Sequence, residues 1–234
     1  MDIETILTRY KELSVLLVVF GVSITDDASL TCPPDMVLVG NSFCMDKYEA
    51  PNQKGGQPLV MFSFVESEAW CESRGKRLCY VDEWEVACQG SSKNKWSYGS
   101  EHQKGVCNDG KTWRQYAPKK LRKWDRSASD VDISSFYEQT TRMDRISLAS
   151  SDHVRNLYQA DPSGSNKHCV SDGVYDLLGN VEEWTRRRHP KVNFSGVLKG
   201  RFWAEPRHCI QRVSNHGDLF RFYETGFRCC KSID

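Results

Sequence analysis

Ten cysteines constrain what this chain can fold into more than any other feature of its sequence. They are spread along most of its length, at Cys32, Cys44, Cys71, Cys79, Cys88, Cys107, Cys169, Cys209, Cys229 and Cys230. The count is even, and no pair has the Cys-x2-Cys spacing of zinc knuckles. The pattern therefore favours disulfide bonds and an oxidising compartment over metal binding. The alternative is a reduced protein in which the cysteines are small buried side chains.

The composition indicates a folded protein without a strong overall charge. Of the 234 residues, 39% are hydrophobic and 27% are charged, which is too apolar for a disordered chain. The length suits one large domain, or one domain with a tail. The formal net charge is +1, so no global field attracts nucleic acid or an anionic membrane. We therefore expect no nucleic-acid partner.

The amino-terminal region contains an uncharged apolar stretch from Leu13 to Ile24. It is shorter than the ~20 residues that cross a bilayer, so we expect no transmembrane anchor. It fits the core of a signal peptide, although acidic residues outnumber basic ones in its flank. The alternative is a buried strand or helix of a cytoplasmic or virion protein. We assign residues 1–35 to a leader, with a candidate signal peptide, and a linker, and 36–234 to the folded domain.

Capping signals predict two short helices. Ser63 and Glu66 have the spacing of a capping box and predict a helix that begins at Ser63. Asp82 and Glu85 repeat the pattern for a second helix, and Gly90 is a suitable residue to end it.

The remainder of the chain is expected to consist of strands and loops. Residues 36–39 and 42–48 are predicted to be strands joined by a tight turn. Residues 111–126 are rich in lysine and arginine; we interpret them as a solvated loop, the alternative being a polyanion-binding patch. Residues 130–162 are polar and are expected to form a surface insertion. Together these two stretches define an insertion at about 111–165.

Three blocks of sequence, in a fixed order, carry the strongest signal in the chain. The first is GKRLC at 75–79 followed by DEWEVAC at 82–88 and WSYG at 96–99. The second is VYDLLGNVEEW at 174–184. The third is KGRFW at 199–203, with RHC at 207–209 and GFRCC at 226–230.

Together the blocks resemble the formylglycine-generating enzyme family, also called the sulfatase-modifying factor domain. The resemblance runs from about Met36 to Cys230. It implies an α+β fold of the C-type-lectin-like kind, rich in loops, with two short helices and small antiparallel sheets. The family includes oxidases as well as binding and display proteins, so the fold does not settle the function.

In the oxidases, the resemblance implies a copper(I) ion held by two cysteine thiolates, which activates dioxygen to convert a sulfatase cysteine to formylglycine. Here Cys209 matches the second thiolate, but Ala204 stands where the first is expected. Arg201 also replaces a glycine of the usual pattern. We therefore expect a protein without oxidase activity. The alternative is an active oxidase that uses copper and Cys209 as a catalytic residue, with Cys229 or Cys230 as substitute ligand.

The second block also resembles a calcium site of the family. The resemblance implies ligation by the side chains of Asp176 and Glu183 and by the carbonyl groups of Gly179 and Val181, which are hard oxygen donors of the kind calcium prefers. We expect calcium as a structural cofactor. The alternative is that the two carboxylates cap turns and pair with nearby arginines. Glu182 departs from the tryptophan that is usual at its position.

For the disulfides, the family pattern implies a bond between Cys88 and Cys229. Cys71 and Cys79 could pair locally, and the remaining connectivity cannot be assigned from sequence.

The final block provides a candidate surface for a ligand. It is rich in the arginine and aromatic side chains typical of recognition surfaces, although a generic loop with core aromatics would have a similar composition. The candidate residues are Arg201, Trp203, Arg207, His208, Arg212 and His216. We expect a calcium-braced binding or display module for a protein or glycan. It would act in secreted or periplasmic form or at a cell surface, or alternatively as a phage virion component.

Overall fold

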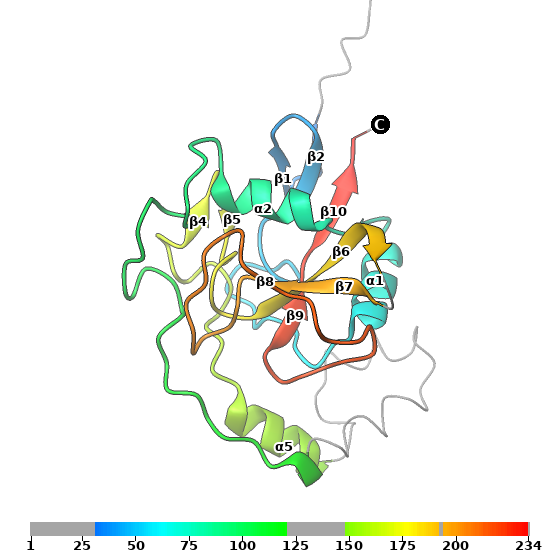
Figure 1. Ribbon diagram of the computed structural model, residues 1–234, viewed down its shortest axis with the longest axis vertical. Coiled ribbons are helices and arrows are strands. Elements are labelled where there is room, and N and C mark those ends of the chain that lie inside the picture. Colours follow the sequence, from blue (N-terminus) through cyan, green and yellow to red (C-terminus); the bar gives the residue numbers. More distant parts are fainter. Residues whose placement is uncertain (1–30, 121–147, 192–193, 234) are drawn as a thin grey trace, which may run out of the picture.

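The computed structural model describes residues 31–120, 148–191 and 194–233 (Figure 1). The candidate signal peptide and residues 121–147 of the predicted insertion lie outside these residues. Within the described part of the chain, none of the helices combines the length and apolar character required to cross a bilayer.

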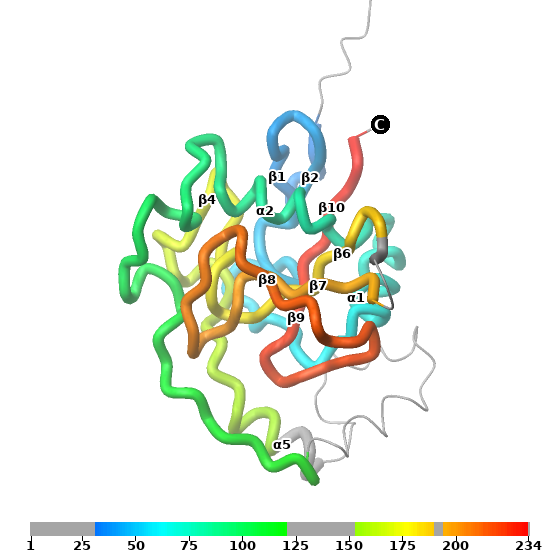
Figure 2. Tube along the Cα trace, viewed as in Figure 1, coloured from blue at the N-terminus to red at the C-terminus, as the bar shows by residue number. Residues whose placement is uncertain are grey.

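The first sheet is built around an amino-terminal hairpin. Strand β1 (Met36–Val39) pairs with β2 (Phe43–Asp46), as the sequence predicted, although β2 is shorter than expected. Gly40 and Asn41 both have positive φ angles, of 54° and 53°, which suits a tight hairpin turn. The carboxy-terminal strand β10 (Cys229–Ser232) pairs with β2 on one side and with β3 (Arg77–Leu78) on the other. The two ends of the domain therefore lie side by side (Figure 2).

Both predicted helices are present. Helix α1 (Phe64–Glu72) has the predicted capping box, in which Ser63 N–H donates to Glu66 Oε2 at 2.8 Å. Helix α2 (Val81–Gln89) starts earlier than predicted, because Glu83 rather than Glu85 accepts the N–H of the preceding Tyr80, at 2.9 Å. Gly90 ends α2 with a φ angle of 63°, as expected.

The second sheet has the order β8-β7-β6-β9. Its strands are β6 (Glu182–Lys191), β7 (Phe194–Lys199), β8 (Arg212–Val213) and β9 (Thr225–Phe227). The β6–β9 pairing is parallel, unlike the other pairings among the described strands, and it aligns Glu182 with Thr225. A two-stranded hairpin, β4 (Val170–Ser171) and β5 (Val174–Tyr175), precedes this sheet in the chain.

The described end of the predicted insertion contributes to the core. Helix α5 (Leu148–Leu157) lies at the opposite end of the molecule from the β1–β2 hairpin (Figure 1). Its residues Val154 and Leu157 are buried in the same cluster as Trp203. The expectation of a purely surface insertion is therefore wrong for this part, because two apolar side chains in a polar stretch suffice to dock one helical turn.

The predicted Cys88–Cys229 bond is wrong. Cys229 is bonded to Cys71, and Cys88 is bonded to Cys209. Neighbouring residues of a strand point to opposite faces. Cys229 therefore faces the core that contains the end of α1, whereas Cys230 faces the core beneath α2.

The other pairings follow from the same arrangement. Cys230 is bonded to Cys79, which excludes the local pairing of Cys71 with Cys79. The two remaining bonds join Cys32 to Cys44 and Cys107 to Cys169. All ten cysteines fall within the described residues, and each of them is paired.

Candidate functional site

The thiols of the implied copper site are not available in the oxidised protein. Cys209 is fully buried and bonded to Cys88. Cys229 and Cys230, the substitute ligands considered above, are bonded elsewhere. Ala204, at the position expected for the first thiolate, lines an open cleft. A two-thiolate copper site therefore cannot form without breaking the Cys88–Cys209 bond.

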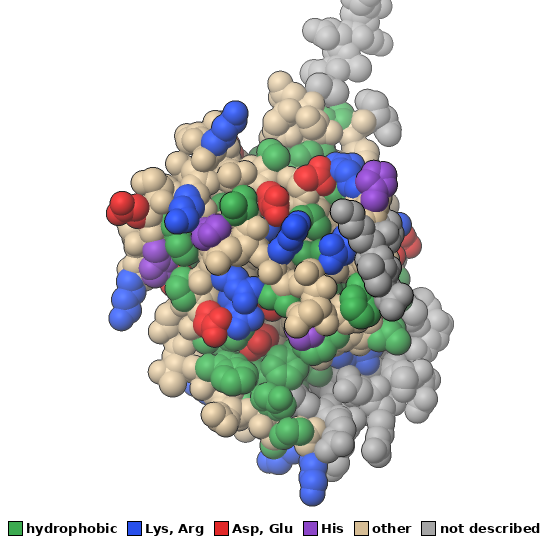
Figure 3. Space-filling view, viewed as in Figure 1, with side chains coloured by type: hydrophobic (Ala, Val, Ile, Leu, Met, Phe, Trp, Pro, Cys, Tyr) green, Lys and Arg blue, Asp and Glu red, His purple; other side chains and the backbone are tan. Residues whose placement is uncertain are grey.

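This cleft has a volume of about 420 Å³ and lies beside the first residues of β6 and β9. We call it the acidic–aromatic cleft. Figure 3 shows hydrophobic side chains gathered beside a mixed group of acidic and basic side chains on the face that carries β7 and β8. The residues that line the acidic–aromatic cleft are Trp113, Tyr116, Glu182, Arg201, Phe202, Ala204, Glu205, His216, Phe220, Phe222, Glu224 and Thr225.

Aromatic rings form one wall of the cleft. Tyr116 contacts the edge of Phe222, with ring centroids 5.0 Å apart, and is 6.2 Å from Trp113. His216 stacks on Phe220 at 3.8 Å. Trp113 and Tyr116 are 41% and 38% exposed, so this wall is accessible from solvent.

Two buried glutamates also line the cleft. The parallel β6–β9 pairing brings Glu182 next to Glu224, and the Glu182 N–H donates to the Glu224 carbonyl group at 2.8 Å. Glu224 Oε2 accepts from Trp113 Nε1 at 3.1 Å. Glu182 Oε1 is buried and accepts no hydrogen bond.

The arginines of the adjacent loop only partly neutralise these carboxylates. Arg201 lies over the Phe202 ring and forms its short contacts with Glu205, at 2.9 Å from Nε and 2.7 Å from Nη2. Its Nη1 is 3.8 Å from Glu182 Oε1, and Arg207 Nη1 is at the same distance. The Arg201 backbone has a φ angle of 65°, a conformation that suits the glycine usual at this position in the family better than arginine.

Burial dominates the electrostatics of the cleft. It raises the pKa of Glu182 to about 7, against the lowering effect of Arg201 and Arg207. Burial, followed by repulsion from Glu182, raises the pKa of Glu224 to about 8. Burial also lowers the pKa of His216, which favours its neutral form. Near neutral pH, both glutamates are therefore poised between protonation states.

The structure separates the residues of the predicted ligand surface. Arg201 and His216 line the cleft, and Arg207 approaches it through Glu182. Trp203 does not belong to a surface, because its side chain is fully buried in the core. His208 lies against Trp96, with ring centroids 6.1 Å apart, away from the cleft. Arg212 is exposed on the edge strand β8.

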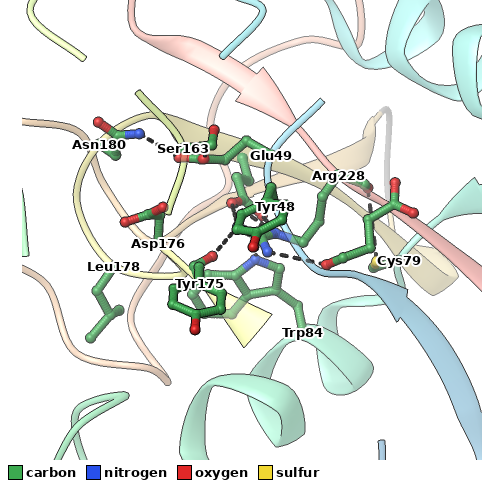
Figure 4. Close-up of polar contacts among 12 residues, drawn as sticks. Tyr48, Glu49, Cys79, Trp84, Ser163, Tyr175, Asp176, Leu178, Asn180 and Arg228 are labelled. Atoms are coloured by element: carbon green, nitrogen blue, oxygen red, sulfur yellow. Dashed lines mark hydrogen bonds and ion pairs between the residues drawn. The ribbon is translucent and has the colours of Figure 1, made fainter. Parts of the chain in front are cut away.

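The predicted calcium block forms a buried polar hub (Figure 4). Glu183 and Arg228 are both fully buried and form an ion pair at 2.6 Å. Glu183 Oε2 also accepts from Trp84 Nε1 at 2.8 Å. Asp176 Oδ2 accepts from Gly164 N–H at 2.6 Å, while its Oδ1 accepts no hydrogen bond. Of the two predicted carboxylates, only Asp176 therefore has an uncommitted oxygen, and a calcium ion would have to compete with Arg228 for Glu183.

Neighbouring side chains add negative charge to this hub. Glu49 is fully buried and accepts from Asn180 Nδ2 at 2.8 Å and from Ser163 Oγ at 2.6 Å. Burial raises the pKa of Glu49 well above its ordinary value, and burial raises that of Asp176 to about 6. No group of three or more histidine, cysteine or acidic side chains in the described residues is arranged to hold a metal ion. Calcium ligation by Asp176, Gly179, Val181 and Glu183 stays a prediction.

Sequence reasoning missed most of the cleft. Glu224 and the aromatic residues at 113–116 and 220–222 were not predicted to be near one another. Glu182 was noted only because it replaces a tryptophan. That replacement is the signal that could have identified it, because a carboxylate at a position normally occupied by a large buried ring has to face a cavity or a partner.

The fold, the ordered motifs and the altered thiol site define a formylglycine-generating-enzyme-like class of protein. The family model for the sulfatase-modifying factor enzyme 1-like domain matches residues 42–233. The chain belongs to this family. A protein of Bos taurus named inactive C-alpha-formylglycine-generating enzyme 2 is 27% identical over 150 residues, which is 63% of this chain and 39% of that protein. The protein of the same name in Mus musculus is 27% identical over 185 residues, which is 75% of this chain and 49% of that protein. The chain thus spans less than half the length of these relatives.

Solved structures support the same fold. The structure of CarF matches with a TM-score of 0.52 at 13% identity, and the match covers 82% of this chain and 87% of the CarF chain. PvdO from Pseudomonas aeruginosa has a TM-score of 0.50 at 16% identity, covering 81% and 80%. The Major Tropism Determinant P3c variant has a TM-score of 0.50 at 12% identity, covering 87% of this chain and 54% of its own. These matches confirm the α+β, C-type-lectin-like fold.

Proposed function

We propose that this protein is a binding module of the family that lacks oxidase chemistry and uses the acidic–aromatic cleft as its ligand site. The observation that carries the proposal is that Cys209 is bonded to Cys88, while Ala204, at the position expected for the other thiolate, lines the cleft. The position expected for an oxidase's first thiolate therefore lies in a cleft lined by aromatic and acidic side chains, which is a lining suited to binding.

Two comparisons support the proposal. The mammalian relatives carry the word inactive in their names. One protein of similar fold is named for determining tropism, which is a recognition function. Five disulfides favour an oxidising location, so we place the module outside the cytoplasm, in secreted or periplasmic form or at a cell surface, with a virion component as the alternative. Calcium bracing at Asp176 remains part of the proposal.

The oxidase alternative can be tested directly. The protein is incubated with copper(I), dioxygen and a peptide containing the Cys-x-Pro-x-Arg sequence of sulfatases, and aldehyde is measured by mass spectrometry. We expect no aldehyde, and no tight copper binding, because no thiolate pair is available. A matched variant, Cys88→Ser with Ala204→Cys, frees one thiol and adds the other, and should gain copper binding. Aldehyde formation by the unaltered protein would overturn the proposal.

The binding role can be tested with the same protein. A library of small amines, acids and sugars is screened by two-dimensional NMR of the isotope-labelled chain. We expect binders to shift backbone resonances of residues that line the cleft, such as Ala204 and Phe222. If all binders perturb other surfaces only, the cleft is not the ligand site.

A further inference from the structure

One buried carboxylate oxygen in the cleft, that of Glu182, lacks a hydrogen-bond donor. The Glu182 side chain is 4% exposed, and its Oε1 accepts no hydrogen bond. Its nearest cations, Arg201 and Arg207, are 3.8 Å away, and Arg201 is already committed to Glu205 at 2.7 Å. A buried carboxylate oxygen without a donor is costly, so a ligand that supplies one gains the contact without displacing a protein partner.

The charge around this oxygen favours a cation. The lining contains the carboxyl groups of Glu182, Glu205 and Glu224 and the guanidinium group of Arg201, and Arg207 approaches Glu182 from outside the lining at 3.8 Å. When Glu182 and Glu224 are ionised, three carboxylates face two guanidinium groups, so a cation would relieve the repulsion between the carboxylates and an anion would add to it. Glu224 lines the same cleft, and its backbone carbonyl group accepts from the Glu182 N–H at 2.8 Å, so the two side chains leave the backbone at neighbouring points.

The aromatic wall adds a second requirement. The rings of Trp113, Tyr116 and Phe222 offer apolar surface within the same cleft as the glutamates. Such rings pack against an alkyl stem and attract a cation at their faces. A primary ammonium group provides three donors in a compact volume, whereas a quaternary ammonium group provides none.

We propose that the acidic–aromatic cleft binds a primary ammonium group on an apolar stem, with Glu182 and Glu224 as acceptors and the aromatic wall around the stem. The proposal rests on the proposed function and names its ligand class. A lysine side chain of a partner protein and a free alkylamine share this chemistry.

The first experiment compares ligands of matched stem. Calorimetry with the full chain measures binding of pentylamine, pentyltrimethylammonium and pentanol. We expect pentylamine to bind at least about tenfold more tightly than either control, since only it donates charged hydrogen bonds. Equal binding of the trimethylated compound would overturn the proposal, because the rings alone would then account for recognition. Equal binding of pentanol, or no binding of pentylamine, would overturn it as well.

A further arm separates the two sources of the ammonium group. Nα-acetyl-lysine methylamide stands for a protein lysine and is compared with pentylamine. Either order of affinity supports the proposal. Tighter binding of the lysine derivative assigns a protein partner, and tighter binding of pentylamine assigns a small molecule.

Variants test the role of each carboxylate. Glu182→Gln and Glu224→Gln keep the side-chain shape but remove the charge, and each should weaken pentylamine at least about tenfold. Glu101→Gln, at an exposed carboxylate that does not line the cleft, is the matched control and should bind as the unaltered protein does. Melting curves show whether each variant is folded. A folded Glu182→Gln variant with unchanged affinity would refute the assignment.

The pH dependence gives an independent readout. An ammonium ion binds the ionised form of Glu224 more tightly than the protonated form, so binding must displace the proton that Glu224 holds below its raised pKa. Between about pH 7 and pH 9, ionisation of Glu224 should tighten pentylamine binding by about tenfold, because its pKa is about 8. The other charged or titratable groups near the glutamates are Arg201, Arg207, Glu205, His216, Tyr116 and Tyr223.

Affinity that is flat or falls across this range would contradict the proposal. Failure of the proposed function and failure of this inference give different results. Aldehyde formation would contradict the proposed function. If the protein forms no aldehyde and binds other compounds in the cleft but not amines, only this inference is wrong.

Discussion

Replacing Glu182 with glutamine should stabilise the folded protein at high pH and leave it nearly unchanged at low pH. The carboxyl group is 4% exposed, and burial raises its pKa from an ordinary value of 4.5 to about 7. A shift of ~2.5 units at ~1.36 kcal/mol per unit corresponds to ~3 kcal/mol of folding free energy. Because the folded state holds the proton more tightly, this stability is present below the unfolded pKa and is lost as pH rises through the folded pKa.

The window for the measurement follows from these two pKa values. Between about pH 5 and pH 8 the unaltered protein should lose roughly 2.5 kcal/mol through Glu182 alone. Other buried carboxyls, including Glu224 and Asp176, also have raised pKa values, so the whole protein will lose more. The difference between Glu182→Gln and the unaltered chain isolates the Glu182 contribution, since glutamine does not titrate.

Urea unfolding with the disulfides intact, followed by tryptophan fluorescence at several pH values, provides the assay. We expect the Glu182→Gln variant to be more stable by roughly 2–3 kcal/mol at about pH 8, and the advantage to shrink to below about 1 kcal/mol at about pH 5. Glu101→Gln, at an exposed carboxylate, should show no such trend. A Glu182→Gln variant that is less stable than the parent at pH 8 would refute the reasoning, because Glu182 would then be stabilised by its arginines.

Three further predictions concern other parts of the molecule. Added calcium should raise the melting temperature, by the equivalent of ~2.7 kcal/mol of stability at a hundredfold excess over its dissociation constant. Asp176→Asn should abolish this response. A melting curve that neither calcium nor a chelator changes would contradict the predicted calcium site. Non-reducing peptide mapping should recover Cys88 joined to Cys209, and recovery of either as a free thiol would contradict the structure. Arg228→Met should destabilise the protein by about 3–5 kcal/mol in urea unfolding, because it leaves Glu183 buried without its cation. Adding Glu183→Gln should restore part of that loss, and purely additive effects would show that the pair is not coupled.

The parts of this fold that sequence could predict are those that local chemistry determines. The capping box of Ser63 needs only a residue three positions away, and the turn at Gly40 needs only backbone freedom. The disulfide partners depend instead on which face of β10 each cysteine occupies, and that is fixed by a pairing between opposite ends of the chain. A shift of one residue in that strand would exchange the faces of Cys229 and Cys230. The Cys88–Cys229 prediction failed because Cys229 faces the core that contains Cys71, whereas Cys88 lies in the other core with Cys209.

The cleft was beyond sequence reasoning for a similar reason. Glu182 and Glu224 come together through a parallel pairing of strands, and such strands are not joined by a hairpin turn that the sequence could reveal. Trp113 reaches them from a segment that composition marks only as basic and polar. The departures from the family pattern at Glu182 and Arg201 were visible in the sequence, but their convergence on one cleft was not.

The stability cost of Glu182 bears on whether the cleft has a function. Nothing among the described residues supplies its Oε1 with a hydrogen bond, and the fold would be more stable above neutral pH with glutamine there. A residue that supports only the structure should weaken both folding and binding when it is replaced. A residue that serves a ligand should instead show effects of opposite sign, with folding strengthened and binding weakened by the same Glu182→Gln substitution. The two measurements on one variant therefore separate a structural glutamate from a functional one, and the geometry of the cleft predicts the second outcome.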